Sequence, residues 1–269
     1  MSNSVVQESN TVNRQYKSSI FAMLFGEREA LLELYNAVNG TDYRDPELLE
    51  INTLKNAIYL AVRNDVSFLM DFRLHLYEHQ STWNPNIPLR DLFYASNLYS
   101  KITESENLHG SRRIKIPAPR FLVFYNGRED YPDRVVMKLS EMYGKKEKNP
   151  SLELEVVILN INEGHNKALT DACRTLREYA IYTAKVRRNV RERNQPLTNA
   201  VESAVSECIR AGVLESFLRK QRAEAISVSI FEYDFARHMA AISEESREEG
   251  REEGRKEGLE EGYRQGQDS

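Results

Sequence analysis

The segment DVSFLMDFRLHLYEHQS, residues 65–81, decides the fold. It contains two runs of alternating apolar and polar side chains with room for only a tight turn between them, and this pattern predicts a β-hairpin. If Asp71 and Phe72 form the centre of the turn, Asp65 lies directly opposite Glu78 on the neighbouring strand. The hairpin thus predicts two facing carboxylates.

Side chains alternate along a strand, so Gln80 points to the same face as Glu78, and Tyr77 and His79 point to the other face. Facing carboxylates repel one another unless a positive charge lies between them. Mg²⁺ prefers oxygen ligands and keeps several waters, so Asp65 and Glu78 are candidate ligands. The alternative is a solvent-facing strand with polar decoration, because a shift of one residue in the turn removes the pairing.

The rest of the chain predicts an α/β core followed by helices. The elements are expected from apolar periodicity and from Pro, Gly and Asn boundaries. One or two helices over 17–38 precede the hairpin strands 65–71 and 73–81, and a helix over 88–102 follows them. Buried strands come next over 120–127 and 152–162, with a helical or irregular insert around 135–143, and the chain continues with helices near 167–190, 197–220 and 228–245.

The chain divides into four expected regions. These are a flexible arm (1–15), an α/β core (16–165), a helical region packed on the core (166–245) and a charged tail with repeated glycines (246–269). Glycine recurs every four residues from Gly250 to Gly266, and each glycine weakens a helix by about 1 kcal/mol relative to alanine. The tail is either a frayed, solubilising segment or a helix that forms against a partner.

Composition excludes several classes. The hydrophobic fraction of 41% argues against disorder throughout. The net charge of −4 comes from residues 243–269, which hold ten acidic and five basic side chains, so the remainder is near neutral and total charge does not decide for or against DNA. No apolar run approaches the length of a membrane span, and no secretory signal begins the chain. Cys173 and Cys208 have no zinc or disulfide spacing, so we expect two buried thiols in a reducing, cytoplasmic compartment.

The stretch from Asn64 to Ser100, with NDVSFLMD, LYEHQST and NPNIPLRDLFYASNLYS, resembles the recombination-promoting nuclease and transposase family, a branch of the PD-(D/E)xK nuclease superfamily. The likeness continues less sharply from about Tyr16 to the C-terminus. It implies a restriction-endonuclease-like core, that is, a small mixed sheet flanked by helices, with a helical C-terminal extension. No DDE-type triad of a transposase is recognisable.

The resemblance also implies roles for the hairpin residues. Asp65 and Glu78 would bind Mg²⁺, for which Mn²⁺ can substitute, and the main-chain carbonyl of His79 would add a ligand. Gln80 takes the place of the superfamily lysine, as it does in this family. A neutral glutamine orients the attacking water only by hydrogen bonds, whereas a lysine also stabilises negative charge. In some superfamily members a glutamate of the first helix joins the site, and Glu33 is the candidate here.

Phosphate contacts are expected from a basic cluster in KVRRNVRER, residues 185–193, although a solvated helix end is the commoner role of such a cluster. Its members are Lys185, Arg187, Arg188, Arg191 and Arg193. Trp83 and Tyr94 are candidates for base stacking, with core packing as the alternative.

These features together predict a Mg²⁺-dependent DNA endonuclease linked to recombination, mobile elements or phage defence. A homodimer would suit a nuclease that cuts both strands. The competing hypothesis, favoured by Gln80, is a nuclease-fold protein that no longer cleaves and binds DNA or a protein partner.

Overall fold

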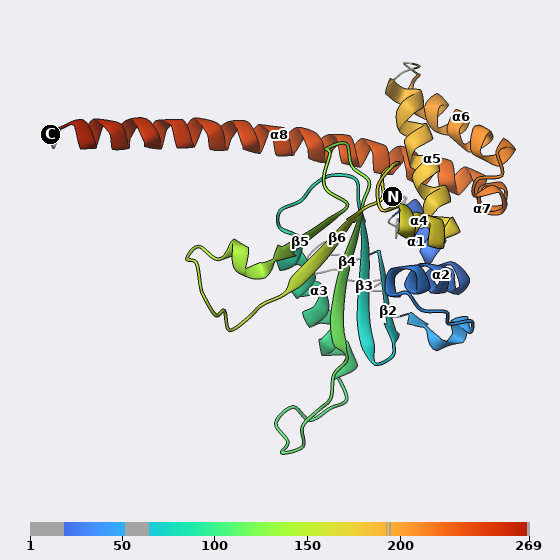
Figure 1. The fold of residues 1–269 in the computed structure, drawn as a ribbon, viewed down its shortest axis with the longest axis horizontal. Coiled ribbons are helices and arrows are strands. Elements are labelled where there is room, and N and C mark those ends of the chain that lie inside the picture. The colour runs from blue at the N-terminus through green and yellow to red at the C-terminus, as the bar shows by residue number, and fades with distance from the viewer. Residues whose placement is uncertain (1–18, 52–64, 192, 194, 268–269) are drawn as a thin grey trace, which may run out of the picture.

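A computed structural model describes residues 19–51, 65–191, 193 and 195–267. The expected arm at 1–15 lies outside these residues. The centre of the fold is a mixed six-stranded sheet in the order β1-β2-β3-β4-β6-β5 (Figure 1). Its strands are β1 (Glu50–Ile51), β2 (Val66–Met70), β3 (Arg73–Gln80), β4 (Ala118–Tyr125), β5 (Arg134–Lys138) and β6 (Glu155–Asn160).

The predicted hairpin is confirmed as β2 and β3. Asp71 and Phe72 form the turn, with φ angles of 51° and 55°, and Val66 lies opposite Tyr77, which is the predicted register. Left-handed conformations at both central residues define a type I′ turn, the geometry that matches the twist of the flanking strands. β3 then pairs in parallel with β4, and β4 pairs in parallel with β6.

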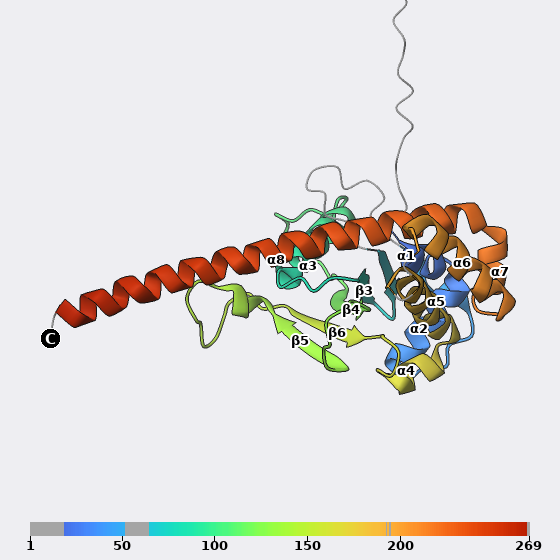
Figure 2. The same ribbon diagram turned by 90° about the horizontal axis from the view of Figure 1, so that it is seen from above.

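Helices cover both faces of the sheet. α3 (Ile87–Ile102) lies on one face, where Tyr94 and Leu98 pack with Leu76 and Val123 of the central strands. The other face carries α1 (Ile20–Phe25), α2 (Arg28–Asn39) and the C-terminal helices, which share one hydrophobic cluster with Phe68 and Tyr77 (Figure 2). In the structure the C-terminal helices therefore pack against this face of the sheet, and the chain forms a mixed α/β fold.

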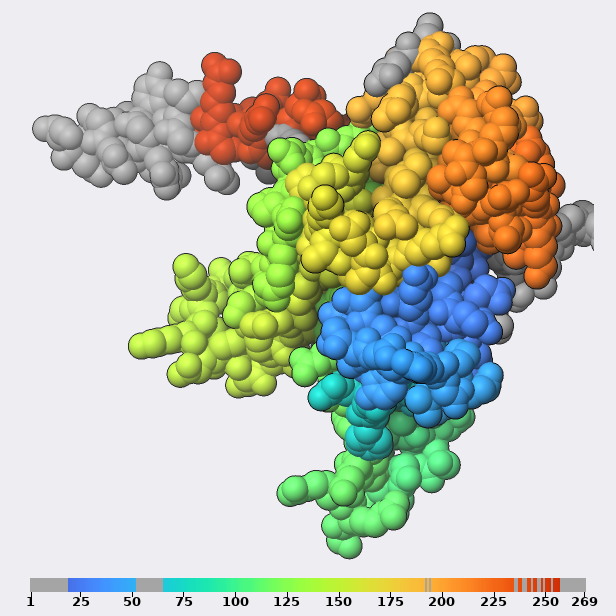
Figure 3. All heavy atoms as spheres, turned by 45° about the vertical axis from the view of Figure 1, so that its right-hand side comes forward, coloured from blue at the N-terminus to red at the C-terminus, as the bar shows by residue number. Residues whose placement is uncertain are grey.

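The C-terminal helices are α4 (Lys167–Ala172), α5 (Arg174–Arg191), α6 (Leu197–Arg210), α7 (Glu215–Lys220) and α8 (Arg222–Gln267). Figure 3 shows α4 and α5 lying directly against the first two helices on the molecular surface. Cys173 and Cys208 are both free and buried, as expected. Within the described part of the chain, no helix is long and apolar enough to cross a membrane.

The insert around 135–143 contains an element that the sequence pattern missed. Residues 134–138 form β5, an edge strand antiparallel to β6, and the short 3-10 helix η2 (Leu139–Met142) follows it. The middle of β5 is half-buried and both of its ends are exposed, so it lacks the apolar alternation that marks a strand. β1 and the 3-10 helix η1 (Pro46–Leu48) also lie outside the expected elements.

The glycine-repeat tail is helical in the structure. α8 continues through Gly250 and Gly254 to Gln267 and projects beyond the sheet (Figures 1 and 2). Of the two alternatives for the tail, the structure therefore has the helical one. The first turns of α8 are anchored by buried Ala225 and Val228. Adding residues to an existing helix costs far less than starting one, because nucleation is the unfavourable step.

Candidate functional site

Glu78 lies near the end of β3 on the face covered by α3, and its side chain is almost fully buried. Its Oε1 accepts a hydrogen bond from Gln80 Nε2 at 3.0 Å and pairs with Arg90 Nη2 at 2.7 Å. Its Oε2 is buried and has no hydrogen-bond partner among the described residues. Burial raises the pKa of Glu78, and the Arg90 charge opposes this shift. The structure therefore brings Glu78 and Gln80 together and adds Arg90.

Asp91 is a second buried carboxylate beside Glu78, and sequence reasoning missed it. Its side chain is 3% exposed. Burial, followed by the Glu78 charge, raises the Asp91 pKa well above its ordinary value, and Arg90 lowers it. Two carboxyl groups thus share one guanidinium, which also donates to the Tyr94 hydroxyl. Polar residues on an amphipathic helix are usually solvated, so no sequence signal marked Asp91.

Asp65, the other predicted ligand, is held at the start of the hairpin by different partners. Its Oδ2 accepts the main-chain N–H of His79 at 2.7 Å, and its Oδ1 accepts the Ser19 hydroxyl at 3.1 Å. Ser19 is also the N-cap of α1, where its Oγ accepts the Ala22 N–H. The first helix therefore contributes a serine to Asp65.

Glu232 of α8 is a further carboxylate near Asp65, and sequence reasoning missed it too. The main-chain N–H of Ile20, at the start of α1, lowers the Glu232 pKa. Burial raises the pKa of Glu232 to about 8, and the nearby Asp65 charge adds to the shift. Glu232 is far from the hairpin in sequence, and only the packing of α8 against α1 brings it close.

Glu33, the candidate carboxylate from the first helices, is engaged elsewhere. Its Oε1 accepts the main-chain N–H of Arg174 at 2.6 Å, and its Oε2 accepts the Thr175 hydroxyl at 2.6 Å. These contacts place the negative charge at the N-terminus of α5, where unpaired N–H groups and the helix dipole favour it. The contacts explain Glu33 as a helix cap that joins α2 to α5.

The donor groups near the predicted metal ligands are few. Among the described residues, no group of three or more His, Cys, Asp or Glu side chains is arranged to hold a metal ion. The bare Oε2 of Glu78 nevertheless fits a hard cation, which binds anionic oxygen. The contacts of the two predicted ligands differ, because Glu78 pairs with Arg90 of α3 and Asp65 accepts from Ser19 at the start of α1. Asp65, Glu78 and the His79 carbonyl remain the residues that the sequence predicts to hold Mg²⁺.

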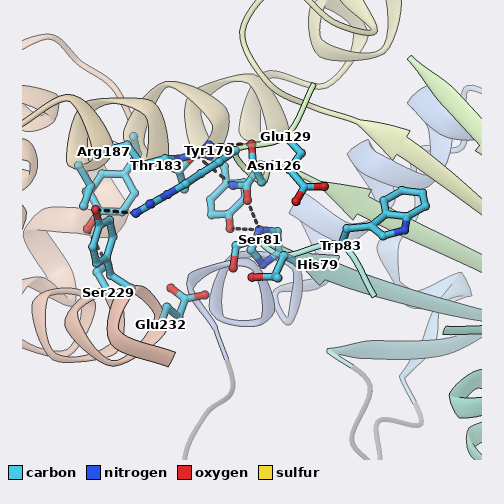
Figure 4. Close-up of a pocket in the computed structure, with 16 residues that line it drawn as sticks. His79, Ser81, Trp83, Asn126, Glu129, Tyr179, Thr183, Arg187, Ser229 and Glu232 are labelled. Carbon is cyan, nitrogen blue, oxygen red and sulfur yellow. Dashed lines mark hydrogen bonds between the residues drawn. The ribbon is translucent and has the colours of Figure 1, made fainter. Parts of the chain in front are cut away.

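A pocket lies on the opposite side of β3 from Glu78, beyond the carboxyl ends of the parallel strands. It is an open cavity of about 930 Å³, including the solvent at its mouth. Three segments line it, namely the end of β3 with residues 81–83, the β4 end with residues 126–129, and α5 with α8 (Figure 4). Ligands of open α/β sheets commonly bind at such strand ends.

A hydrogen-bond network forms the floor of the pocket. The ring Nε2 of His79 lies 2.8 Å from Asn126 Oδ1 and 2.9 Å from the Tyr179 hydroxyl. Asn126 Nδ2 donates to the Thr183 hydroxyl, which itself donates to the Ala180 carbonyl. Burial lowers the pKa of His79 to about 4, so its ring is neutral at pH 7.

The basic residues of the α5 cluster have different partners. Lys185 and Arg193 both pair with Glu207, and Arg188 pairs with Glu163. Arg191 is exposed. Arg187 differs from the others, because it lines the pocket and contacts only neutral acceptors, the Gly127 carbonyl and Asn162 Oδ1. The five cations therefore do not form one uniform phosphate-binding surface.

The two aromatic residues that were candidates for base stacking lie in different environments. Tyr94 is fully buried in the core under α3. Trp83 is half-buried at the pocket, and its ring stacks on Tyr131 with centroids 4.0 Å apart.

Comparisons with family models, with curated proteins and with solved structures found no match to this chain. The family named from the sequence motifs therefore remains a resemblance.

Proposed function

We propose that the protein is a metal-dependent DNA endonuclease of the PD-(D/E)xK kind, with Asp65 and Glu78 as metal ligands and Gln80 as the residue that orients them. The observation that carries the proposal is the buried Oε2 of Glu78, which has no hydrogen-bond partner. A buried carboxylate oxygen without a donor is costly, and a cation would compensate it.

The hairpin register supports the proposal. The pairing of Val66 with Tyr77 puts the position of Asp65 at the level of Glu78, at the end of the β2–β3 pairing, while β3 continues to pair with β4 through Gln80. Gln80 Nε2 orients Glu78 through its 3.0 Å hydrogen bond. Bound Mg²⁺ would lower the pKa of a coordinated water and so supply the nucleophile for phosphodiester hydrolysis.

The test is cleavage of supercoiled plasmid by the purified protein with Mg²⁺, with Mn²⁺ or with EDTA. We expect nicking by the wild type with either metal, none with EDTA, and none by Asp65→Ala or Glu78→Gln. Asp42→Ala is the matched control, because it removes an exposed carboxylate that pairs only with exposed Arg44. Cleavage that persists in Asp65→Ala would overturn the assignment.

A second function, a nuclease-fold module that binds DNA or protein without cleaving, is favoured by Arg90. Its guanidinium already neutralises Glu78 at 2.7 Å, so the carboxylate has a positive partner without a metal. Calorimetry with Mg²⁺ separates the two functions, because only the nuclease requires a binding isotherm that is lost in Asp65→Ala and Glu78→Gln.

The proposed partner is DNA, and a homodimer acting in the cytoplasm would suit cleavage of both strands. The link to recombination, mobile elements or phage defence comes from the resemblance of the hairpin and α3 motifs alone.

A further inference from the structure

Arg187 is a cation without a counterion in a partly buried position. Its Nη1 donates to the Gly127 carbonyl and to Asn162 Oδ1, both at 3.2 Å, and both acceptors are neutral. None of the ion pairs among the described residues includes it. Burial lowers its pKa, and the neighbouring charges of Arg191 and Arg128 lower it further. A desolvated guanidinium of this kind is stabilised by a bound anion.

Two carboxylates line the same pocket, Glu129 and Glu232, and none of the ion pairs among the described residues joins either of them to Arg187. Glu129 Oε2 accepts a hydrogen bond from the Tyr131 hydroxyl. The groups that act on Glu232 are the Ile20 main chain and Asp65. The groups that act on Arg187 are tyrosines and arginines.

Tyr179 supplies a second donor. The Thr183 hydroxyl donates to Ala180, so it must accept from Asn126 Nδ2, and this fixes Asn126 Oδ1 toward His79. His79 Nε2 must then carry the proton that it donates to Asn126, and the Tyr179 oxygen accepts from the same N–H. In this tautomer His79 does not accept the hydroxyl proton of Tyr179, and the Tyr179 hydroxyl is the second polar group that lines the cavity.

The other side of the pocket is aromatic. In Figure 4, Arg187 and Trp83 lie at opposite sides of the view, with His79 and Tyr179 between them. One face of Trp83 is covered by Tyr131, and the residue lines the cavity. Bases stack on aromatic side chains irrespective of base sequence, and phosphates suit arginine forks.

We propose that this pocket binds a nucleotide phosphomonoester, with the phosphate on Arg187 and Tyr179 and the base toward Trp83. The ligand is either a free mononucleotide or the phosphorylated end of a DNA strand. The pocket lies on the opposite side of β3 from Glu78, and the proposal does not require the chain to cleave DNA.

Trp83 is the only tryptophan of the chain, so its fluorescence reports on this pocket alone. The full-length protein is titrated in EDTA, where metal-dependent cleavage does not occur. The ligands are 2′-deoxyadenosine 5′-monophosphate, 2′-deoxyadenosine, and one oligonucleotide prepared with either a 5′-phosphate or a 5′-hydroxyl. We expect a saturable change with the nucleotide, with the phosphorylated oligonucleotide or with both, and none with the two ligands that lack the phosphomonoester.

The deciding variants are Arg187→Gln and Tyr179→Phe. Arg187→Gln should weaken binding roughly tenfold or more, because a hydrogen bond to a charged group is lost, and Tyr179→Phe should weaken it less. Arg188→Gln is the matched control on the same helix, since that side chain is exposed and pairs with Glu163. Tyr179→Phe keeps the buried ring, so it remains informative if Arg187→Gln is poorly folded.

Binding of the free nucleotide alone identifies a small-molecule site, and binding of the phosphorylated oligonucleotide alone identifies a DNA-end site. Equal binding of deoxyadenosine and its monophosphate, unchanged affinity in both Arg187→Gln and Tyr179→Phe, or no fluorescence change with any ligand would overturn the proposal. Failure of plasmid cleavage would leave it standing, because these titrations contain no metal.

Discussion

Arg90 Nη2 lies 2.7 Å from Glu78 Oε1, and the Glu78 side chain of this ion pair is only 9% exposed. The same carboxylate has its other oxygen buried without a partner, and Asp91 adds a second buried acid beside it. Arg90 is thus the positive charge that pairs with Glu78, and its charge also lowers the pKa of Asp91.

Arg90→Met should destabilise the protein, because it leaves Glu78 buried without its cation. Removal of one partner of a buried ion pair costs 3–5 kcal/mol, and we expect about 2 kcal/mol after allowing for the exposed third of the Arg90 side chain. The free energy of unfolding from urea denaturation at pH 7 measures this loss. The double variant Arg90→Met with Glu78→Gln should recover part of it.

Arg112→Met is the control for this prediction, since Arg112 pairs with Glu106 on an exposed surface and should change the unfolding free energy little. Equal unfolding midpoints for wild type and Arg90→Met would show that Glu78 does not depend on Arg90.

The hairpin was predictable because its turn and both strands are local in sequence. The alternation around Asp71 and Phe72 fixes the register, and the structure confirms that Glu78 and Gln80 share a face. The contacts of Asp65 were not predictable, because Ser19 reaches it only through the packing of α1 on the sheet.

The remaining site residues depend on long-range packing. Glu232 lies near the start of α1, although more than 200 residues of sequence separate them. Arg187 differs from the other basic residues of α5 because it contacts the Gly127 carbonyl beyond the end of β4. The sequence pattern shows that α5 carries several basic residues. It does not show which of them form ion pairs, because the partners Glu207 and Glu163 belong to other segments of the chain.

Phe72→Gly should stabilise the hairpin. Phe72 has a φ of 55°, which disfavours residues that have a Cβ, and its side chain is 66% exposed. Relief of this strain should add about 0.5–1 kcal/mol to the unfolding free energy, after the greater flexibility of glycine in the unfolded chain is subtracted. Phe72→Leu is the control, because it keeps the Cβ and should give no gain. A loss of stability in Phe72→Gly would mean that the exposed ring makes a stabilising contact.

Glu33→Gln should lower stability without changing plasmid cleavage. The substitution removes the negative charge that accepts the N–H of Arg174 and the hydroxyl of Thr175 at the start of α5. Loss of such a cap costs about 1 kcal/mol. Thermal unfolding and plasmid nicking are measured on the same preparation. Loss of nicking with stability retained would instead place Glu33 in the catalytic site.

His75 should make stability depend on pH. Burial lowers its pKa from 6.5 to about 4, with further lowering by Arg73 and Arg120, and Nε2 is buried without a hydrogen-bond partner. The unfolded chain therefore binds a proton more readily than the folded protein, so the contribution of His75 is full above pH 6.5 and is lost as the pH falls toward 4. Between pH 7 and pH 5 this loss is about 2 kcal/mol.

His75→Phe preserves the aromatic stacking on Phe68 and should reduce the loss measured by urea unfolding by that amount. His109→Gln, in an exposed loop, should leave the pH dependence unchanged. The same pH dependence in wild type and His75→Phe would show that His75 is not the titrating group.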